Sequence, residues 1–317
     1  MSALNLQLVT LYVKFAYFLP PEVKKRPLLW HNLGLKSFSL YLLGLSMAHD
    51  HDSPSKLEIS THAALPMVLM LFIEMALNFY SAPKNSIFIS PYLLAFFVTS
   101  LISFLVLWKG EICRGQASRL SFILPFLLIF AVGNFLYSIG FTPKHNPMAV
   151  ASIAAVFACL IYFRLPEDQT LYNTLMYCGL AISSIGIIQY LAIYWFELPS
   201  LFNGIRANNF AQVLLGILLA GWYLMLAKSR LDVFLKLLVK TALVVLILNY
   251  CWTAFVLYQH LQIMPDMPLL SFIIYFAAQF VILLMLAWLL LGKNIKNPTA
   301  WTVATLLAIL YPFANVV

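Results

Sequence analysis

Nine apolar runs, most of them close to 20 residues long, constrain this chain more than any other feature of its sequence. They cover residues 63–82, 87–108, 121–140, 148–163, 172–197, 209–227, 241–258, 269–291 and 298–316. A helix needs about 20 apolar residues to cross the hydrocarbon core of a bilayer. Only 9% of the residues are charged, against about a quarter in soluble domains. We therefore predict an all-α, polytopic integral membrane protein with short loops.

The first 62 residues follow this pattern less clearly. Residues 1–19 are apolar but contain Lys14 and end at Pro20-Pro21, and the apolar run 37–48 is too short to cross a bilayer as a straight helix. We predict one N-terminal span plus an interfacial or re-entrant segment in residues 1–62. Residues 63–317 then form a bundle of nine spans, which gives about ten transmembrane helices in all.

The distribution of lysine and arginine predicts the orientation of these spans. Basic residues gather in cytoplasmic loops of membrane proteins. Residues 20–62, 109–119, 164–171, 228–240 and 292–297, when placed in the cytoplasm, hold 15 of the 19 basic residues. Three lie outside, namely Lys84, Lys144 and Arg206, and the last, Lys14, lies in the N-terminal apolar run. The external connections are then 83–86, 141–147, 198–208 and 259–268, and the C-terminus lies outside.

Glu74 is an acidic residue inside a predicted span. Carboxylates in the hydrocarbon region are costly and usually have a function. Asn78 and Ser81 follow it at i+4 and i+7, so the three residues form one polar stripe that should face the bundle interior. The alternative is that Glu74 is protonated, or satisfied by a neighbouring helix, and serves only helix packing.

The stretch from Gln189 to Gln212 leaves one predicted span, crosses an external loop and enters the next. Arg206 precedes Asn208 and Asn209 at the predicted start of the next helix. A guanidinium group, side-chain amides and a helix N-terminus together favour a phosphate group. The alternative is that an asparagine caps the helix while Arg206 extends to lipid head groups.

The next external loop holds His260 and Asp266. Histidine is the usual general base near neutral pH, so these two residues join Glu74 as candidate catalytic groups. The alternative is that His260 is only solvated.

Other chemistry has weaker support in the sequence. His49-Asp50-His51-Asp52 resembles a metal chelate, with His31 and His62 nearby, but short histidine-rich tracts are compositional evidence only. The four cysteines are far apart and form no metal or disulfide pattern. The motifs DDxxD, GxxxxGK[ST], GxSxG and HExxH are absent. We expect no metal and no cofactor, and we attribute the net charge of +8 to cytoplasmic loops and anionic lipid rather than to nucleic acid.

A further pattern extends from one predicted span, across the external loop, into the next span. The residues concerned are Ile185-Gly-Ile-Ile-Gln189-Tyr-Leu and Asn203-Gly-Ile-Arg206-Ala-Asn208-Asn209-Phe-Ala-Gln212. This pattern resembles the superfamily of O-antigen ligases, O-antigen polymerases and pilin O-oligosaccharyltransferases. The resemblance implies metal-independent glycan transfer in which Arg206 holds a pyrophosphate and a later histidine activates the acceptor. The chain departs from the family in its short external loop 259–268, which contains no arginine.

We therefore expect a glycosyltransferase in the inner (plasma) membrane of a bacterium. It would move a glycan from a polyprenyl-pyrophosphate carrier to an acceptor protein, such as a pilin, or to a saccharide. The alternative function is a secondary transporter or lipid flippase in which Glu74 relays protons or ions. A third reading is an accessory subunit without chemistry of its own.

Overall fold

The computed structural model describes residues 55–81, 89–110, 112–140, 147–163, 165–197, 207–263, 265, 269–291 and 294–315. The contacts divide the chain into residues 1–53 and 54–317. The fold described below is that of the second unit. Our predictions for the N-terminal span, for the segment 37–48 and for the histidine-rich tract 49–52 lie outside the described residues.

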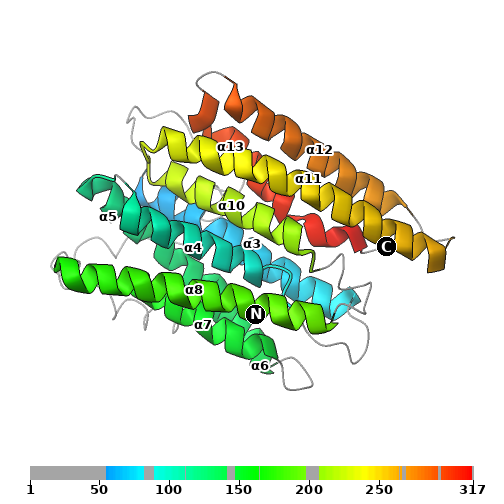
Figure 1. Ribbon diagram of the computed structural model, residues 1–317, viewed down its shortest axis with the longest axis horizontal. Helices are drawn as coiled ribbons and strands as arrows, with labels where there is room; N and C mark the ends of the chain where they lie inside the picture. Colours follow the sequence, from blue (N-terminus) through cyan, green and yellow to red (C-terminus); the bar gives the residue numbers. More distant parts are fainter. Residues whose placement is uncertain are drawn as a thin grey trace, which may run out of the picture. The chain divides into compact units, whose positions relative to one another are not determined.

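All regular structure in the described residues is helical, which confirms an all-α polytopic protein (Figure 1). The α-helices are α3 (Lys56–Ser81), α4 (Leu93–Lys109), α5 (Arg114–Ile123), α6 (Leu127–Gly140), α7 (Pro147–Phe163), α8 (Gln169–Glu197), α10 (Asn209–Leu226), α11 (Asp232–Ile263), α12 (Leu270–Leu290) and α13 (Pro298–Ile309). Short 3-10 segments are η1 (Leu124–Phe126), η2 (Asn294–Lys296) and η3 (Tyr311–Asn315). Among the described residues, six candidate spans are long and apolar enough to cross a membrane. One of them runs from Gly115 to Gly140 through α5, η1 and α6. The helices α4, α7 and α13 are apolar but shorter.

Several helices extend beyond the apolar runs that predicted them. α11 covers residues 232–263, not 241–258, and α3 begins at Lys56, not at residue 63. In α11 the extra residues at the N-terminal end include Lys236 and Lys240, which interrupt the hydropathy pattern without interrupting the helix. A helix continues past the hydrocarbon core because its backbone bonds stay satisfied in the head-group region. Hydropathy therefore located α3 and α11 but underestimated their lengths.

α10 is the central helix of the described unit. Of its 18-residue apolar window, 72% is buried, against 28% to 39% for the other long spans. α4 lies beside it, with α8 and α7 beyond α4 on one side and α11, α12 and α13 on the other (Figure 1). A helix that is apolar all round, as α10 is, fits this enclosed position.

Two glycines let other helices approach α10 closely. A Cβ atom at Gly216 would lie 2.7 Å from the Ala95 carbonyl oxygen of α4, and one at Gly221 would lie 2.1 Å from the ring of Trp301 in α13. Thr99 of α4 also donates a hydrogen bond to the Gly216 carbonyl oxygen at 3.1 Å. Small residues at such contacts are typical of helix packing in membranes, because close packing replaces the hydrophobic effect there.

Hydrogen bonds show that α4 and α8 run in opposite directions. At one end of the bundle, Tyr172 at the start of α8 donates to the Leu107 carbonyl at the end of α4, at 2.7 Å. At the other end, Tyr190 in the last third of α8 donates to the Ser90 carbonyl just before α4, at 2.8 Å. The start of each helix therefore lies beside the end of the other. This is the arrangement that a chain crossing a membrane repeatedly requires.

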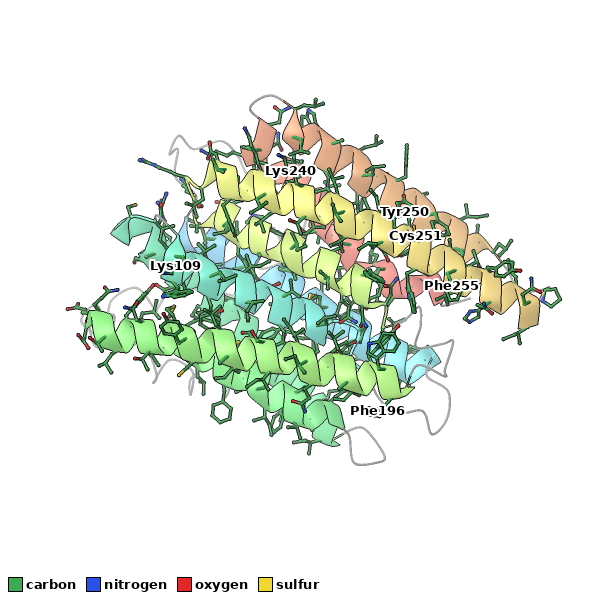
Figure 2. All side chains as sticks on the ribbon, viewed as in Figure 1. Lys109, Phe196, Lys240, Tyr250, Cys251 and Phe255 are labelled. Carbon is green, nitrogen blue, oxygen red and sulfur yellow. The ribbon has the colours of Figure 1, made fainter. Side chains whose placement is uncertain are left out.

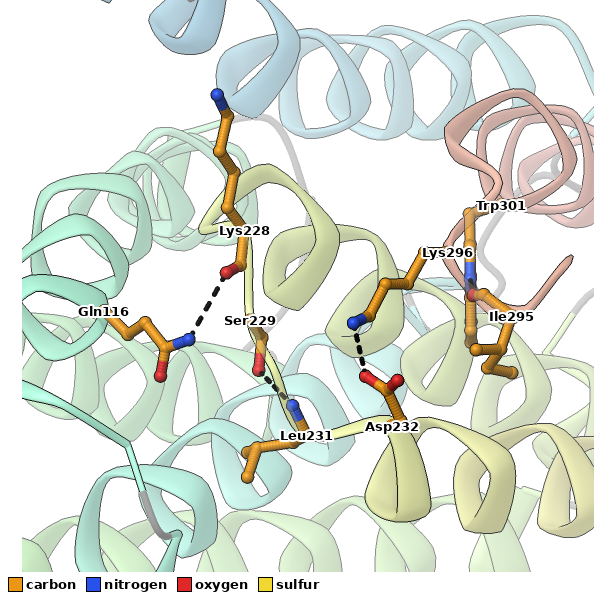
Figure 3. Close-up of polar contacts among 8 residues, drawn as sticks. All are labelled: Gln116, Lys228, Ser229, Leu231, Asp232, Ile295, Lys296 and Trp301. Carbon is orange, nitrogen blue, oxygen red and sulfur yellow. Dashed lines mark hydrogen bonds and ion pairs between the residues drawn. The ribbon is translucent and has the colours of Figure 1, made fainter. Parts of the chain in front are cut away.

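The two ends differ sharply in charge. The described lysines and arginines all lie at the end of the bundle where α4 and α10 finish, which we call the basic end. In Figure 2, Lys109 and Lys240 lie toward the basic end, and Phe196 and Phe255 lie toward the opposite end. Figure 3 shows contacts at the basic end, where Lys296 pairs with Asp232 at 2.6 Å and Gln116 donates to the Lys228 carbonyl. Exposed aromatic residues mark the opposite end, on α3 (Phe79, Tyr80) and on α8 (Trp195, Phe196). Basic loops and an aromatic belt are the expected marks of the cytoplasmic side and of a membrane interface.

The orientation can be tested with thiols at the two ends. Cys113 is an exposed native cysteine at the start of α5, at the basic end, and Tyr80→Cys would place a thiol at the opposite end. In intact cells, an impermeant maleimide should label the Tyr80→Cys variant and leave Cys113 unlabelled until the membrane is opened. Labelling of Cys113 in sealed cells would reverse the orientation.

Candidate functional site

Glu74 lies at the centre of a buried polar cluster shared by three helices and the segment before α4. Its carboxylate accepts a hydrogen bond from the Ser90 hydroxyl at 2.6 Å and one from the Asn134 side-chain amide at 2.8 Å. Ser152 of α7 donates to the Asn134 carbonyl oxygen. All four side chains have 0% exposure. We call these residues the Glu74 cluster.

The position of Glu74 agrees with our prediction that it faces the bundle interior. It lies seven residues before the end of α3, roughly 10 Å along the helix at about 1.5 Å per residue. An isolated carboxylate at this depth would be prohibitively costly, so bonds from other helices are what permit it. Asn78 is half-buried on the same helix, and the Ser81 side chain lies outside the described part.

A second set of bonds leads from the Glu74 cluster to the central helix. Tyr190 of α8 donates to the Ser90 carbonyl, and its hydroxyl accepts a bond from the Gln212 amide at 2.7 Å. The Gln212 amide also donates to the Ala207 carbonyl, and its own oxygen accepts from the Leu94 backbone N–H at the start of α4. Gln212 therefore joins α4, α8 and the start of α10.

A third polar group lies at the start of α10. The Asn208 side-chain oxygen caps the helix by accepting from the N–H groups of Phe210 and Ala211. Its amide donates to Asn249 at 2.7 Å and to Thr253 at 3.1 Å, both on α11. Asn249 in turn bonds to the hydroxyl of Tyr275 on α12. We call Asn208, Asn249, Thr253 and Tyr275 the Asn208 cluster.

Tyr311, in the last described segment η3, helps to hold the end of the described chain against the start of α4. Its hydroxyl donates to the Pro91 carbonyl, and Tyr92 donates to the Ile309 carbonyl at 2.7 Å, so the start of α4 and the end of α13 bind each other reciprocally. At this end, hydrogen bonds thus lead from Glu74 through Ser90 and Tyr190 to Gln212 at the start of α10.

His260 lies in the last turns of α11 and not in a loop, which corrects our expectation from the sequence. α11 runs to Ile263, three residues past it. The imidazole is 6% exposed, and its Nδ1 atom lies 3.1 Å from the Val256 carbonyl oxygen. His260 shares the buried face of α11 with Asn249 and Thr253, which precede it by eleven and seven residues. It is therefore an interior group near the Asn208 cluster and not a solvated loop residue.

The other candidate site residues differ in their surroundings. Asn208 and Gln212 are buried with their amides bonded to protein, so the capping alternative describes what Asn208 does here. Asn209 is half-buried and, among the described residues, its side-chain oxygen has no partner. Gln189 borders a groove on the membrane-facing surface. Arg206 and Asp266 lie outside the described residues, so their phosphate-binding and catalytic roles stay predictions.

The sequence could have indicated some of the residues that it missed. Asn134 and Asn249 are lone amides inside apolar runs, and such residues commonly bond across helices in membranes. Ser90, Ser152 and Thr253 gave no comparable signal, because serine and threonine in apolar helices often bond to their own backbone. Ser152 does this too, through the Met148 carbonyl.

The described residues bring no three histidine, cysteine, aspartate or glutamate side chains together. His62 is exposed on α3, and the other members of the histidine-rich tract lie outside the described ranges.

Comparison with known proteins gives a family without an activity. A family model described as "integral membrane domain" matches residues 51–317. An uncharacterized protein from Haemophilus influenzae is 28% identical over 235 residues, which cover 73% of this chain and 86% of that protein. No solved structure matches the chain. Since the family model matches most of the chain, including every described helix, the protein belongs to the integral membrane domain family.

Proposed function

We propose that the protein is a proton-coupled secondary transporter in which Glu74 binds and releases the transported proton. The observation that carries this proposal is the Glu74 cluster: a carboxylate with 0% exposure inside a membrane protein, bonded by Ser90 and Asn134 from other segments. Ionisable residues at such positions commonly belong to proton or ion pathways.

The bonding pattern gives protonation a means of acting on the rest of the bundle. An ionised carboxylate only accepts hydrogen bonds, whereas a protonated one also donates. Protonation of Glu74 would therefore force the Ser90 hydroxyl or the Asn134 amide to change partner. Ser90 also accepts from Tyr190 through its backbone, so the change would reach α8 and, through Gln212, the central helix α10. A transporter needs such coupling between its proton site and its helices.

The same geometry fits the transporter better than the glycosyltransferase that we expected first. That enzyme needs side chains that face a phosphate at the surface, yet Asn208 and Gln212 are bonded within the protein. We assign the protein to the inner (plasma) membrane of a bacterium as part of this proposal, supported by its helical spans and by its bacterial relative.

Proton flux in vesicles tests the proposal. The protein would be reconstituted in liposomes that contain a pH-sensitive dye, and solutes would be added from panels of sugars, amino acids, organic acids and organic cations. We expect one class to drive a pH change in wild-type vesicles. Glu74→Gln, which keeps the size and one acceptor of the side chain but cannot titrate, should abolish it.

Glu58→Gln provides a matched control, because Glu58 is an exposed carboxylate on the same helix at the basic end. It should transport like the wild type. A solute-driven pH change of wild-type size in Glu74→Gln vesicles would exclude Glu74 as the proton carrier.

Glycan transfer remains a second candidate because of His260 and Asn209. His260 is buried near the Asn208 cluster, and the unbonded side-chain oxygen of Asn209 lies three residues after Arg206. In this function Arg206 would bind the pyrophosphate of a polyprenyl-linked glycan, and His260 would activate an acceptor protein or saccharide.

A transfer assay in membranes tests this second candidate. Arg206→Lys keeps the charge but loses the planar two-pronged contact, which should lower the transfer rate by about one to two decades. His260→Ala should stop transfer while donor binding persists. Wild-type transfer by both variants, at equal expression, would eliminate the candidate.

A further inference from the structure

A groove between α7 and α8 lies on the membrane-facing surface of the protein. It has a volume of about 310 Å³, and its lining is apolar apart from one residue, Gln189. The lining residues are Val150, Ile153, Ala154 and Phe157 of α7 and Ile182, Ile185 and Gln189 of α8. Phe157 and Ile185 are more than half exposed, so the groove opens toward lipid and not toward the core.

The lining residues of the groove follow α7 and α8 from Gln189 toward the middle of these helices. α7 begins and α8 ends at the end opposite the basic end, so Val150 and Gln189 are the lining residues nearest that end. Phe157 and Ile182 close the inner part of the groove. Gln189 lies seven residues after Ile182, which corresponds to about 10 Å of helix.

Gln189 is a polar group in an apolar setting. Its side chain is half-buried, and no hydrogen bond from it is found among the described residues. An amide without a partner is costly in hydrocarbon. The other buried glutamine of this end, Gln212, is bonded to three groups. Gln189 therefore requires a partner from outside the described protein.

The depth of Gln189 identifies the chemistry of that partner. α8 has 29 residues, about 44 Å of helix, and therefore extends past the roughly 30 Å hydrocarbon core by about 7 Å at each end if centred. Gln189 lies eight residues from the end of α8, about 12 Å. Its Cα atom is thus about 5 Å below the hydrocarbon boundary, and its side chain reaches the level where glycerol esters lie.

We propose that this groove binds one acyl chain of a phospholipid from the adjacent leaflet, with the Gln189 amide donating a hydrogen bond to the ester carbonyl of that chain. The occupant has to combine a hydrogen-bond acceptor with an apolar chain about 10 Å or more in length, running toward the bilayer centre. A diacyl phospholipid has both in the correct order. The inference does not depend on the transport function proposed above.

Photolabelling identifies the occupant directly. The protein would be reconstituted in phosphatidylethanolamine and phosphatidylglycerol vesicles that contain a phosphatidylethanolamine with a diazirine on one acyl chain, and labelled peptides would be mapped by mass spectrometry. We expect label concentrated on residues 150–157 and 182–189. Label spread evenly over the exposed faces of the helices would show ordinary bilayer contact and overturn the proposal.

Two variants separate the amide from the groove. Gln189→Leu removes the hydrogen bond, and Ala154→Phe fills the groove; each should lower labelling of these segments by about fivefold. The matched controls are Gln169→Leu, the same change at the other end of α8, and Leu160→Phe, on α7 outside the groove. Both controls should label like the wild type. Unchanged labelling in either groove variant, in protein that elutes as the wild type does, would contradict the proposal.

Discussion

A carboxylate is costly to bury in hydrocarbon. This cost determines how the helices bond to one another at the end opposite the basic end. Glu74 is fully buried, and transfer of an unbonded charge to such a place costs far more than a folded protein can supply. Ser90 and Asn134 offset this cost with direct bonds, and Ser152 fixes the Asn134 amide by occupying its oxygen. Three helices and the segment before α4 are thereby held at one point, so loss of one partner leaves the others buried and unsatisfied.

The short segment from Ser90 to Tyr92 extends this constraint across the bundle. Ser90 bonds to Glu74 through its side chain and to Tyr190 through its backbone, and the next two residues bond to the end of α13. Through this short segment, Glu74 is linked to α8 on one side of α10 and to the end of α13 on the other. A change in the protonation of Glu74 would therefore alter contacts well beyond its own helix, as a coupled transport cycle requires.

The sequence predicted the positions of the helices because hydropathy identifies segments that can lie in lipid. It predicted that Glu74 faces the bundle interior because a carboxylate that faces lipid is costly. It did not predict which residues would bond to Glu74. Asn134 and Ser152 are 60 and 78 residues away in the chain, and their approach depends on how α6 and α7 pack. His260 was misplaced because α11 continues as a helix beyond its apolar run. The roles of Arg206 and Asp266 stay predictions.

Infrared difference spectroscopy of the reconstituted protein tests the central claim most directly, since it detects the protonation of individual carboxyl groups. Between acidic and alkaline buffer, the wild type should show the loss of a carboxylic acid band that is absent from Glu74→Gln. In Asn134→Leu the band should shift in frequency, because the carboxyl group loses one hydrogen bond. Identical difference spectra for the wild type and Glu74→Gln would show that Glu74 does not exchange a proton, and would contradict the account.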